Sequence, residues 1–273
     1  MRTVAVTGSF DNLRSKHVRF LEEAAKLGNV HVRLWSDKIL QALEGRPPRF
    51  PEQERLYLLQ SLRSVEQVTI VRGETELDAF PDLEAVQSSL WIVGEESDAL
   101  GKRAYAEARG IAYRVIRNQD LSGFPVPSFV PPPFDSSRKR VIVTGCFDWF
   151  HSGHVRFFEE ASARGDLYVV VGHDANIRLL KGEGHPLLSH AERLYMVYSV
   201  RHVHGAMIST GHGWLDAEPE MARIKPHFYV VNEDGDKPEK RAFCAGHGIE
   251  YVVLKRIPKE GLPRRESTLL RDL

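Results

Sequence analysis

The chain has 273 residues, with 37 basic and 37 acidic side chains and 42% hydrophobic residues. The resulting net charge of zero argues against a nucleic-acid or membrane-surface binder, and no run of about 18 apolar residues could span a bilayer. Only two cysteines are present, Cys146 and Cys244, so a disulfide framework is excluded and we expect a cytoplasmic protein. The length accommodates two domains, each with its own core.

The first half of the sequence repeats in the second half. Val-Thr-Gly-Ser-Phe-Asp at residues 6–11 recurs as Val-Thr-Gly-Cys-Phe-Asp at residues 143–148. Further on, Glu-Arg-Leu-Tyr at residues 54–57 recurs at residues 192–195. A repeat whose unit is a whole domain predicts a tandem duplication.

A proline-rich segment separates the two copies. Residues 118–139 contain Pro125, Pro127 and the run Pro131-Pro132-Pro133, a composition that favours extended backbone over helix or sheet. We therefore predict a first domain over residues 1–117, a linker over 118–139 and a second domain over 140–273.

Apolar β-branched runs alternate with helical patterns in the second half. Ser189 followed by Glu192 is a capping box that begins a helix ending near Val200, and Pro238 suits the first turn of another helix. Strands are expected over residues 140–146, 167–172, 206–209, 227–231 and 251–255. This alternation predicts an α/β fold in each half, with a mostly parallel sheet covered by helices on both faces. Ligands of such sheets bind at the carboxyl ends of the strands.

The turn after the strand at residues 140–146 is the best candidate for chemistry. His151, Gly153 and His154 lie at the entrance of the following helix, where free backbone N–H groups and the helix dipole favour an anion. Imidazoles three residues apart face the same way, and Gly153 between them leaves the backbone open. The pattern predicts a phosphate-binding site.

This stretch resembles a known superfamily. Thr144-Gly145-Cys146-Phe147-Asp148 followed by His151-Ser-Gly-His154 is similar to the nucleotidyltransferases marked by a His-x-Gly-His signature, and most similar to their cytidylyltransferase branch. The resemblance implies a Rossmann-like fold and attack by a phosphomonoester on the α-phosphorus of a nucleoside triphosphate, with release of pyrophosphate. It implies CTP with Mg²⁺ as the donor, with ATP as the alternative. The acceptor would be a phosphorylated small alcohol, amino-alcohol or sugar.

The resemblance also assigns roles to residues of the turn and of the next helix. His151 and His154 would contact the phosphates, and Lys181 stands where the family has a phosphate-binding lysine. The turn would contribute nucleotide-binding groups at Thr144, Gly145, Cys146, Phe147 and Gly153. Asp148 either takes part in this site by fixing the turn or is purely structural.

The C-terminal run from Arg264 to Arg271 resembles the second signature of the superfamily, Ile-Ser-Ser-Thr-x-x-Arg. Ser267 and Thr268 are catalytic candidates and Arg271 a nucleotide-binding one, because hydroxyls and amides at a helix start suit phosphate. Glu266 stands where the pattern has a serine, so its carboxylate would either repel triphosphate or point away.

Further nucleotide-binding candidates come from other positions that match the family. They are Arg193 and Arg201 in or after the capped helix, and Asn232, Glu233 and Asp234 after the fourth strand, where the family reads base or ribose. Each could instead be an ordinary ion-pairing or turn residue. Lys255, Arg256 and Lys259 form a basic approach that would suit the acceptor phosphate.

The first half departs from the motif. Arg14-Ser-Lys16-His17 replaces His151-Ser-Gly153-His154, Glu44 stands opposite Lys181, and no counterpart of Ser267-Thr268 precedes the linker. We therefore expect this half to be non-catalytic and to pack on the active half as an internal pseudo-dimer partner, with homo-oligomers also open. Alternatively, Arg14 and Lys16 bind a regulatory anion.

Two other function classes compete with the enzyme. A non-catalytic nucleotide-binding protein is motivated by Glu266 and by the altered first half. A metal-dependent hydrolase would use His151 and His154 as ligands, although the usual partner ligands are missing.

Overall fold

The chain contains two compact units, which the computed structural model describes over residues 2–72, 90–127 and 137–270. The units are Met1–Gly123 and Phe124–Leu273. The division lies inside the predicted linker, whose first residues form a short 3-10 helix, η2 (Asn118–Leu121), in the first unit. Among the described residues, no helix is both long and apolar enough to cross a membrane.

The second unit has five strands and five α-helices among its described residues. The strands are β6 (Arg140–Gly145), β7 (Asp166–Val171), β8 (Gly205–Ile208), β9 (Phe228–Asn232) and β10 (Glu250–Leu254). The helices are α5 (Ser152–Ser162), α6 (Asp174–Lys181), α7 (His190–Tyr198), α8 (Glu218–Ile224) and α9 (Pro238–His247). Short 3-10 helices lie at η3 (Gly213–Leu215), η4 (Glu233–Gly235) and η5 (Ser267–Leu270). All five predicted strands are confirmed, with ends within one residue of the prediction.

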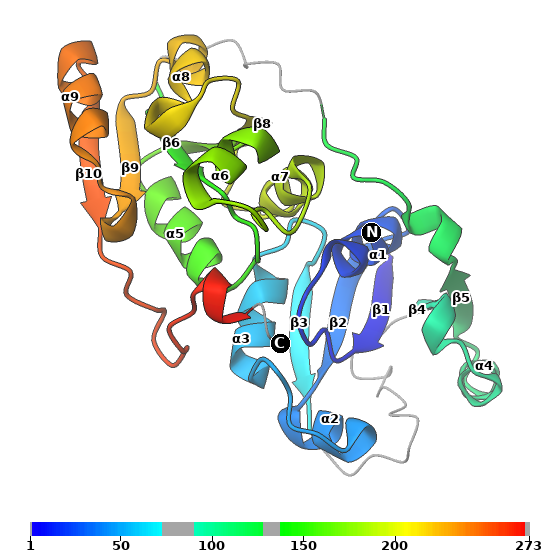
Figure 1. Ribbon diagram of the computed structural model, residues 1–273. Coiled ribbons are helices and arrows are strands. Elements are labelled where there is room, and N and C mark those ends of the chain that lie inside the picture. Colours follow the sequence, from blue (N-terminus) through cyan, green and yellow to red (C-terminus); the bar gives the residue numbers. More distant parts are fainter. Residues whose placement is uncertain (1, 73–89, 128–136, 271–273) are drawn as a thin grey trace. The chain divides into compact units, whose positions relative to one another are not determined.

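The strands of the second unit form one parallel sheet in the order β10-β9-β6-β7-β8, and Figure 1 shows β10 beside β9. Both helix-start signals are confirmed. The Ser189 hydroxyl accepts a hydrogen bond from the Glu192 amide at 3.3 Å, and Pro238 is the first residue of α9. Helix α7 ends at Tyr198, two residues before the predicted end.

Helices cover both faces of this sheet. Ile142, Tyr168 and Tyr229 pack on one face in a buried cluster with Met221 of α8 and Cys244 of α9. Alternate strand residues point to the opposite face, where α5 and α7 contact the strands, as right-handed crossovers require. The predicted α/β architecture is therefore confirmed.

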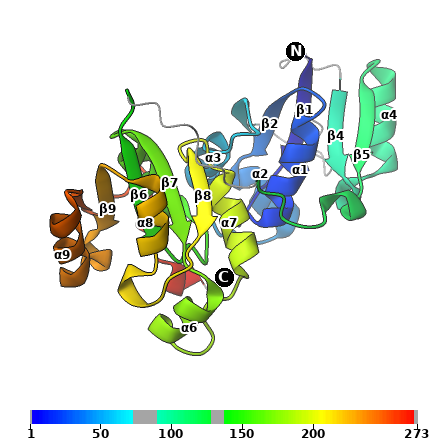
Figure 2. The ribbon, with the colours of Figure 1, turned by 90° about the horizontal axis from the view of Figure 1, so that it is seen from above.

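The first unit has the same order of strands. Its strands are β1 (Thr3–Gly8), β2 (Asn29–Trp35), β3 (Gln67–Val71), β4 (Leu90–Gly94) and β5 (Ala112–Ile116), and its helices are α1 (Ser15–Ala25), α2 (Asp37–Glu44), α3 (Glu52–Gln60), α4 (Leu100–Ala108) and η1 (Glu95–Ser97). They pair in parallel as β3-β2-β1-β4-β5, and Figure 2 shows β2, β1, β4 and β5 side by side. Both sheets are thus of the Rossmann-like type, with the first strand of each unit at the centre.

The order of strands reverses at β6, which has β7 on one side and β9 on the other. In such sheets the loops leaving the central strands diverge at this point and open a crevice at the carboxyl ends. The turn that follows β6 therefore lies at the place where a ligand is expected.

Candidate active site

A tight turn joins β6 to α5. Phe147 adopts a left-handed backbone conformation with φ of 53°, which places its ring over Gly145. A Cβ atom at Gly145 would lie 2.7 Å from that ring, so glycine is required there. The same geometry occurs in the first unit, where Phe10 has φ of 46° and its ring lies over Gly8.

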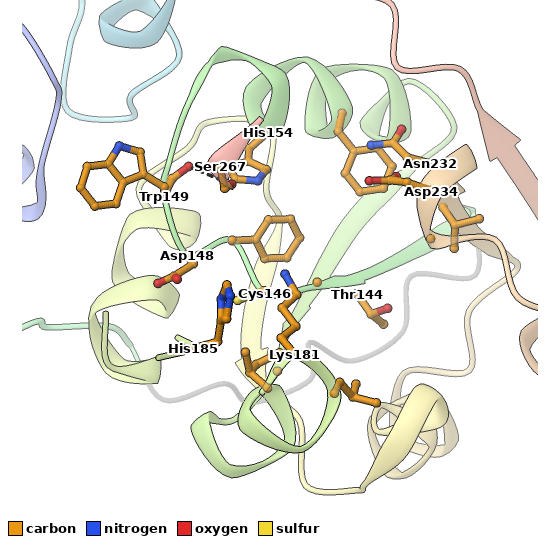
Figure 3. Close-up of a pocket in the computed structure, with 18 of the residues that line it drawn as sticks. Thr144, Cys146, Asp148, Trp149, His154, Lys181, His185, Asn232, Asp234 and Ser267 are labelled. Atoms are coloured by element: carbon orange, nitrogen blue, oxygen red, sulfur yellow. Dashed lines mark hydrogen bonds between the residues drawn. The ribbon is translucent and has the colours of Figure 1, made fainter. Parts of the chain in front are cut away.

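A cavity of about 470 Å³ opens beside this turn, entirely within the second unit. It brings together most of the predicted site residues, from the turn, α5, α6, β9 and the C-terminal segment. Those that line it are Thr144, Gly145, Cys146, Phe147, Asp148, His151, Gly153, His154, Lys181, Asn232, Asp234 and Ser267. Figure 3 shows His154 beside Ser267 on one side of the cavity, Asn232 and Asp234 on another, and Lys181 pointing into the space between them.

The two histidines stack on each other. The rings of His151 and His154 lie 3.9 Å apart between centroids at an angle of 21°. Nδ1 of His151, the N-cap residue of α5, accepts a hydrogen bond from the Gly153 amide at 3.1 Å. The proton of a neutral His151 ring is therefore on Nε2, which lies 3.3 Å from the Ser267 hydroxyl. Nδ1 of His154 is buried and has no hydrogen-bond partner among the described residues.

Both imidazoles are neutral near pH 7. Burial, followed by the cationic side chains of Arg256 and Arg265, lowers the pKa of His151 to about 3. Burial also holds the pKa of His154 well below its usual value, with further contributions from His151, Arg256 and Lys181. A bound polyanion would act in the opposite direction, because a nearby negative charge favours the protonated ring.

Gly153 is required for a reason that the sequence did not reveal. A Cβ atom at this position would lie 2.9 Å from the His151 ring, so any side chain would displace that imidazole. The glycine thus makes room for the neighbouring histidine. In the first unit, Lys16 occupies this position and its ammonium forms an ion pair with Glu96.

Asp148 anchors a loop. Its buried carboxylate accepts hydrogen bonds of 2.8 to 2.9 Å from the backbone amides of Leu187 and Leu188. Of the two roles considered for Asp148, these contacts favour the structural one, in which it fixes the wall of the cavity that follows Lys181.

Arg193 is a second scaffold residue. Its side chain is fully buried, and its guanidinium donates to the carbonyls of Leu188, Cys146 and Gly172 and to the Asp174 carboxylate. It does not line the cavity. Because its donors are engaged by the protein, the geometry gives no support to the prediction that Arg193 binds nucleotide.

Arg201 and Glu233 are exposed and do not line the cavity either. Their assignment to the nucleotide site stays a prediction without geometric support. The side chain of Thr268 is not described, and Arg271 lies outside the described residues.

Three cationic side chains line the cavity, and they are Lys181, Arg256 and Lys240. The ammonium of Lys181, in the last turn of α6, has no hydrogen-bond or ion-pair partner in the part of the chain that the structure describes. Arg256 is 2.9 Å from the Asp234 carboxylate and donates to the carbonyl of Arg265. Of Lys181 and Arg256, Lys181 is therefore the cation more available to an incoming phosphate.

Glu266 lines the cavity, and its carboxylate lies 3.6 Å from the Arg264 guanidinium. The contact partly neutralises the negative charge of Glu266, the residue that replaces a serine of the family signature. Ser267 donates to the carbonyl of Trp149 at 3.4 Å, which ties η5 to the turn before α5.

Four polar residues of the cavity, His185 among them, were missed by the sequence interpretation. Asn176 and Asp216 come from α6 and the loop after β8, and Lys240 comes from the first turns of α9. None belongs to a motif. The one available signal was the repeat itself, because Lys-Arg-Ala at residues 102–104 recurs at residues 240–242. Within the described ranges, no cluster of three or more His, Cys, Asp or Glu side chains could hold a metal ion.

Comparison with known proteins agrees with this geometry. A sequence model described as cytidylyltransferase-like matches residues 5–126 and 142–234, which is more than half of the chain. The chain belongs to the cytidylyltransferase-like family. Both units of this cytidylyltransferase-like protein contribute to the match, although only the second has the histidine pair.

Two curated relatives illustrate the range of the family. The chain is 36% identical over 104 residues to the bifunctional protein HldE of Methylococcus capsulatus, covering 37% of this chain and 21% of HldE. It is 37% identical over 137 residues to an FAD synthase of Methanopyrus kandleri, covering 48% of this chain and 87% of the synthase. The chain thus spans about a fifth of the length of the HldE protein that it matches.

A solved structure, the lipopolysaccharide core biosynthesis protein from Thermoplasma volcanium, is 23% identical with a TM-score of 0.38 and covers 45% of this chain and 99% of that one.

Proposed function

We propose that the second unit transfers a nucleoside monophosphate from a nucleoside triphosphate to a phosphomonoester, releasing pyrophosphate. The observation that carries this proposal is the stacked pair of neutral imidazoles, His151 and His154, at the start of α5 and beside the unpaired ammonium of Lys181. Helix amides, imidazole donors and a free cation converge on one cavity, which is the equipment that a triphosphate needs.

The chemistry requires stabilisation of negative charge rather than a covalent intermediate. As the acceptor oxygen attacks the α-phosphorus, the bond to pyrophosphate breaks and charge develops on the departing oxygens. His154 and Lys181 would donate to these oxygens, while the turn amides hold the phosphates. Pre-positioned donors of this kind typically contribute about two to three orders of magnitude each.

Magnesium would arrive with the triphosphate. Mg²⁺ is commonly held by substrate phosphates with one or two carboxylates and water. Asp234 lines the cavity and is a carboxylate that could join such a complex.

The donor base is the finer part of the proposal. The motif does not fix the base. Its resemblance to the cytidylyltransferase branch favours CTP, whereas one observation favours ATP: the chain covers 87% of a protein named FAD synthase, whose product contains an adenylyl group. The acceptor is a phosphorylated small molecule of the alcohol, amino-alcohol or sugar class.

The test is a matrix of the four ribonucleoside triphosphates with a panel of phosphorylated alcohols, amino-alcohols and sugars, read by pyrophosphate release. Before that assay, the four triphosphates are ranked by how far each one raises the melting temperature, since a ligand that binds the folded state stabilises it. Magnesium dependence is measured in the same assay. Binding of triphosphate without pyrophosphate release for any acceptor would instead favour a nucleotide-binding protein.

A further inference from the structure

Lys240 is a buried cation that the reaction outlined above does not use. Only 6% of its surface is exposed, and it lines the cavity. Its ammonium makes one long hydrogen bond, 3.4 Å to the carbonyl of Gly235, and lies 5.5 Å from the centre of the Tyr229 ring. An ammonium has three donors, so two have no hydrogen-bond acceptor among the described residues.

The counterpart in the first unit makes the same backbone contact at a shorter distance. Lys102 occupies the equivalent position at the start of α4 and is also buried, with 9% exposed. Its ammonium makes a hydrogen bond of 2.7 Å to the carbonyl of Ser97, equivalent to the Gly235 carbonyl. The same bond is therefore longer by 0.7 Å in the unit that has the cavity.

A carboxylate faces the same cavity. Oδ2 of Asp216 accepts a hydrogen bond of 3.0 Å from Nδ2 of Asn176, a side chain with 1% of its surface exposed. Asn176 also bonds the backbone of Gly213 in both directions, which fixes the loop that carries Asp216. Oδ1 of Asp216 has no hydrogen-bond partner within the described chain and is available as an acceptor.

Together, the Asp216 carboxylate and the Lys240 ammonium restrict which chemical groups of a ligand can bind between them. Both side chains line the same cavity. Burial lowers the pKa of Lys240, and the Asp216 carboxylate opposes that shift. An anionic ligand group would meet the carboxylate and a cationic group would meet the ammonium. A neutral group that donates to Asp216 and accepts from Lys240 satisfies both, and neighbouring hydroxyls do this.

We propose that Asp216 and Lys240 bind a vicinal pair of hydroxyls, one donating to the carboxylate and the other accepting from the ammonium. The inference rests on the proposed function, because it concerns the same cavity. Such hydroxyls have two possible sources, the ribose of the triphosphate and a polyol or sugar phosphate acceptor. Under either source, Lys240 and Asp216 determine specificity and do not carry out the transfer itself.

The test is equilibrium binding to the full chain without turnover, using α,β-methylene analogues of ATP and CTP and their 2′-deoxy and 3′-deoxy forms. Ribose 5-phosphate is compared with 2-deoxyribose 5-phosphate on the protein loaded with the analogue. In the wild type, loss of one hydroxyl weakens binding about 10- to 100-fold, the size expected for a hydrogen bond to a charged group. Lys240→Met and Asp216→Asn each reduce that ratio to about threefold or less.

Discrimination among the triphosphates identifies ribose as the source, and discrimination between the sugar phosphates alone identifies the acceptor. The matched control is Lys102→Met, which leaves every ratio at its wild-type value. Asp216→Asn keeps the contact with Asn176, so the test survives if Lys240→Met fails to fold. The inference would be overturned if the binding ratio between hydroxyl and deoxy ligands stayed unchanged in both Lys240→Met and Asp216→Asn. It would also be overturned if Lys240→Met changed the preference for the base instead of this ratio. Absence of pyrophosphate release with intact binding ratios would count against the proposed reaction alone.

Discussion

Asp11 and Asp148 occupy equivalent turns in the two units and make equivalent bonds. Asp11 accepts from the amides of Arg49 and Phe50 at 2.9 Å, as Asp148 does from Leu187 and Leu188. The histidine pair has no such equivalence, because Arg14 stands where His151 caps α5. Contacts found in both units therefore belong to the fold, and contacts found only in the second are candidates for chemistry.

Arg55 in the first unit and Arg193 in the second also make contacts that are found in both units. Arg55 donates to the carbonyls of Phe50, Ser9 and Trp35 and to the Asp37 carboxylate, which repeats the contacts of Arg193 bond for bond. A unit without the histidine pair keeps this buried network. The comparison teaches that an arginine matching a catalytic family is not thereby a ligand-binding residue.

The largest expected effect is on this shared network. Arg193→Met and Arg55→Met should each destabilise their own unit by about 3–5 kcal/mol, because several buried acceptors and a carboxylate lose their donor. Urea denaturation followed by fluorescence and circular dichroism measures the loss. A large cost for only one of the two variants would break the structural equivalence.

His154→Ala should lower pyrophosphate release by about two to three orders of magnitude without unfolding the chain, the size expected for one lost donor to developing charge. The matched control is His17→Ala in the first unit, which should leave turnover close to the wild-type rate. Steady-state kinetics with the best donor and acceptor pair measures both. Equal losses would mean that the first unit also takes part in the reaction.

Acid should weaken the second unit through His151. The unfolded chain binds a proton near the usual imidazole pKa of about 6.5, whereas the folded ring does so only near a pKa of about 3. Unfolding therefore takes up a proton between these pH values, and stability falls as the pH falls, by about 2 kcal/mol from pH 6.5 to 5.

Denaturation of His151→Asn over this pH range should show a flatter profile, since asparagine keeps the N-cap but does not titrate. Burial, Lys16 and Arg14 also lower the pKa of His17, so the first unit should lose stability on acidification too. A saturating triphosphate should reduce the acid sensitivity of the second unit only. An unchanged slope in His151→Asn would contradict the burial of a neutral ring.

The smallest expected effect is at Glu266. Glu266→Gln should change the KM for triphosphate by about threefold or less, because a solvent-exposed ion pair such as that with Arg264 contributes little. Initial rates over a range of triphosphate concentrations measure it. A gain of tenfold or more would show that the carboxylate repels the substrate.

The periodicity of hydrophobic residues in the sequence was sufficient to predict where the helices and strands of the second unit lie. The strand from Arg140, the cap at Ser189 and the helix start at Pro238 were found because hydrophobic alternation and capping chemistry act between residues a few positions apart. The sequence also revealed the motif of His151 and His154, the Phe-Asp turn and the altered motif of the first copy, since each is a contiguous stretch.

Only the tertiary structure distinguished the residues that stabilise the fold from the residues that line the cavity. The burial of Arg193, the loop-anchoring bonds of Asp148 and the contact of Gly153 with the His151 ring depend on groups that meet across the fold. Asp216 joins the cavity from the loop after β8 and Lys240 from helix α9, and no local motif marks either residue. A sequence specifies its short-range structure directly, but which polar groups share one buried space is decided by the packing of distant segments.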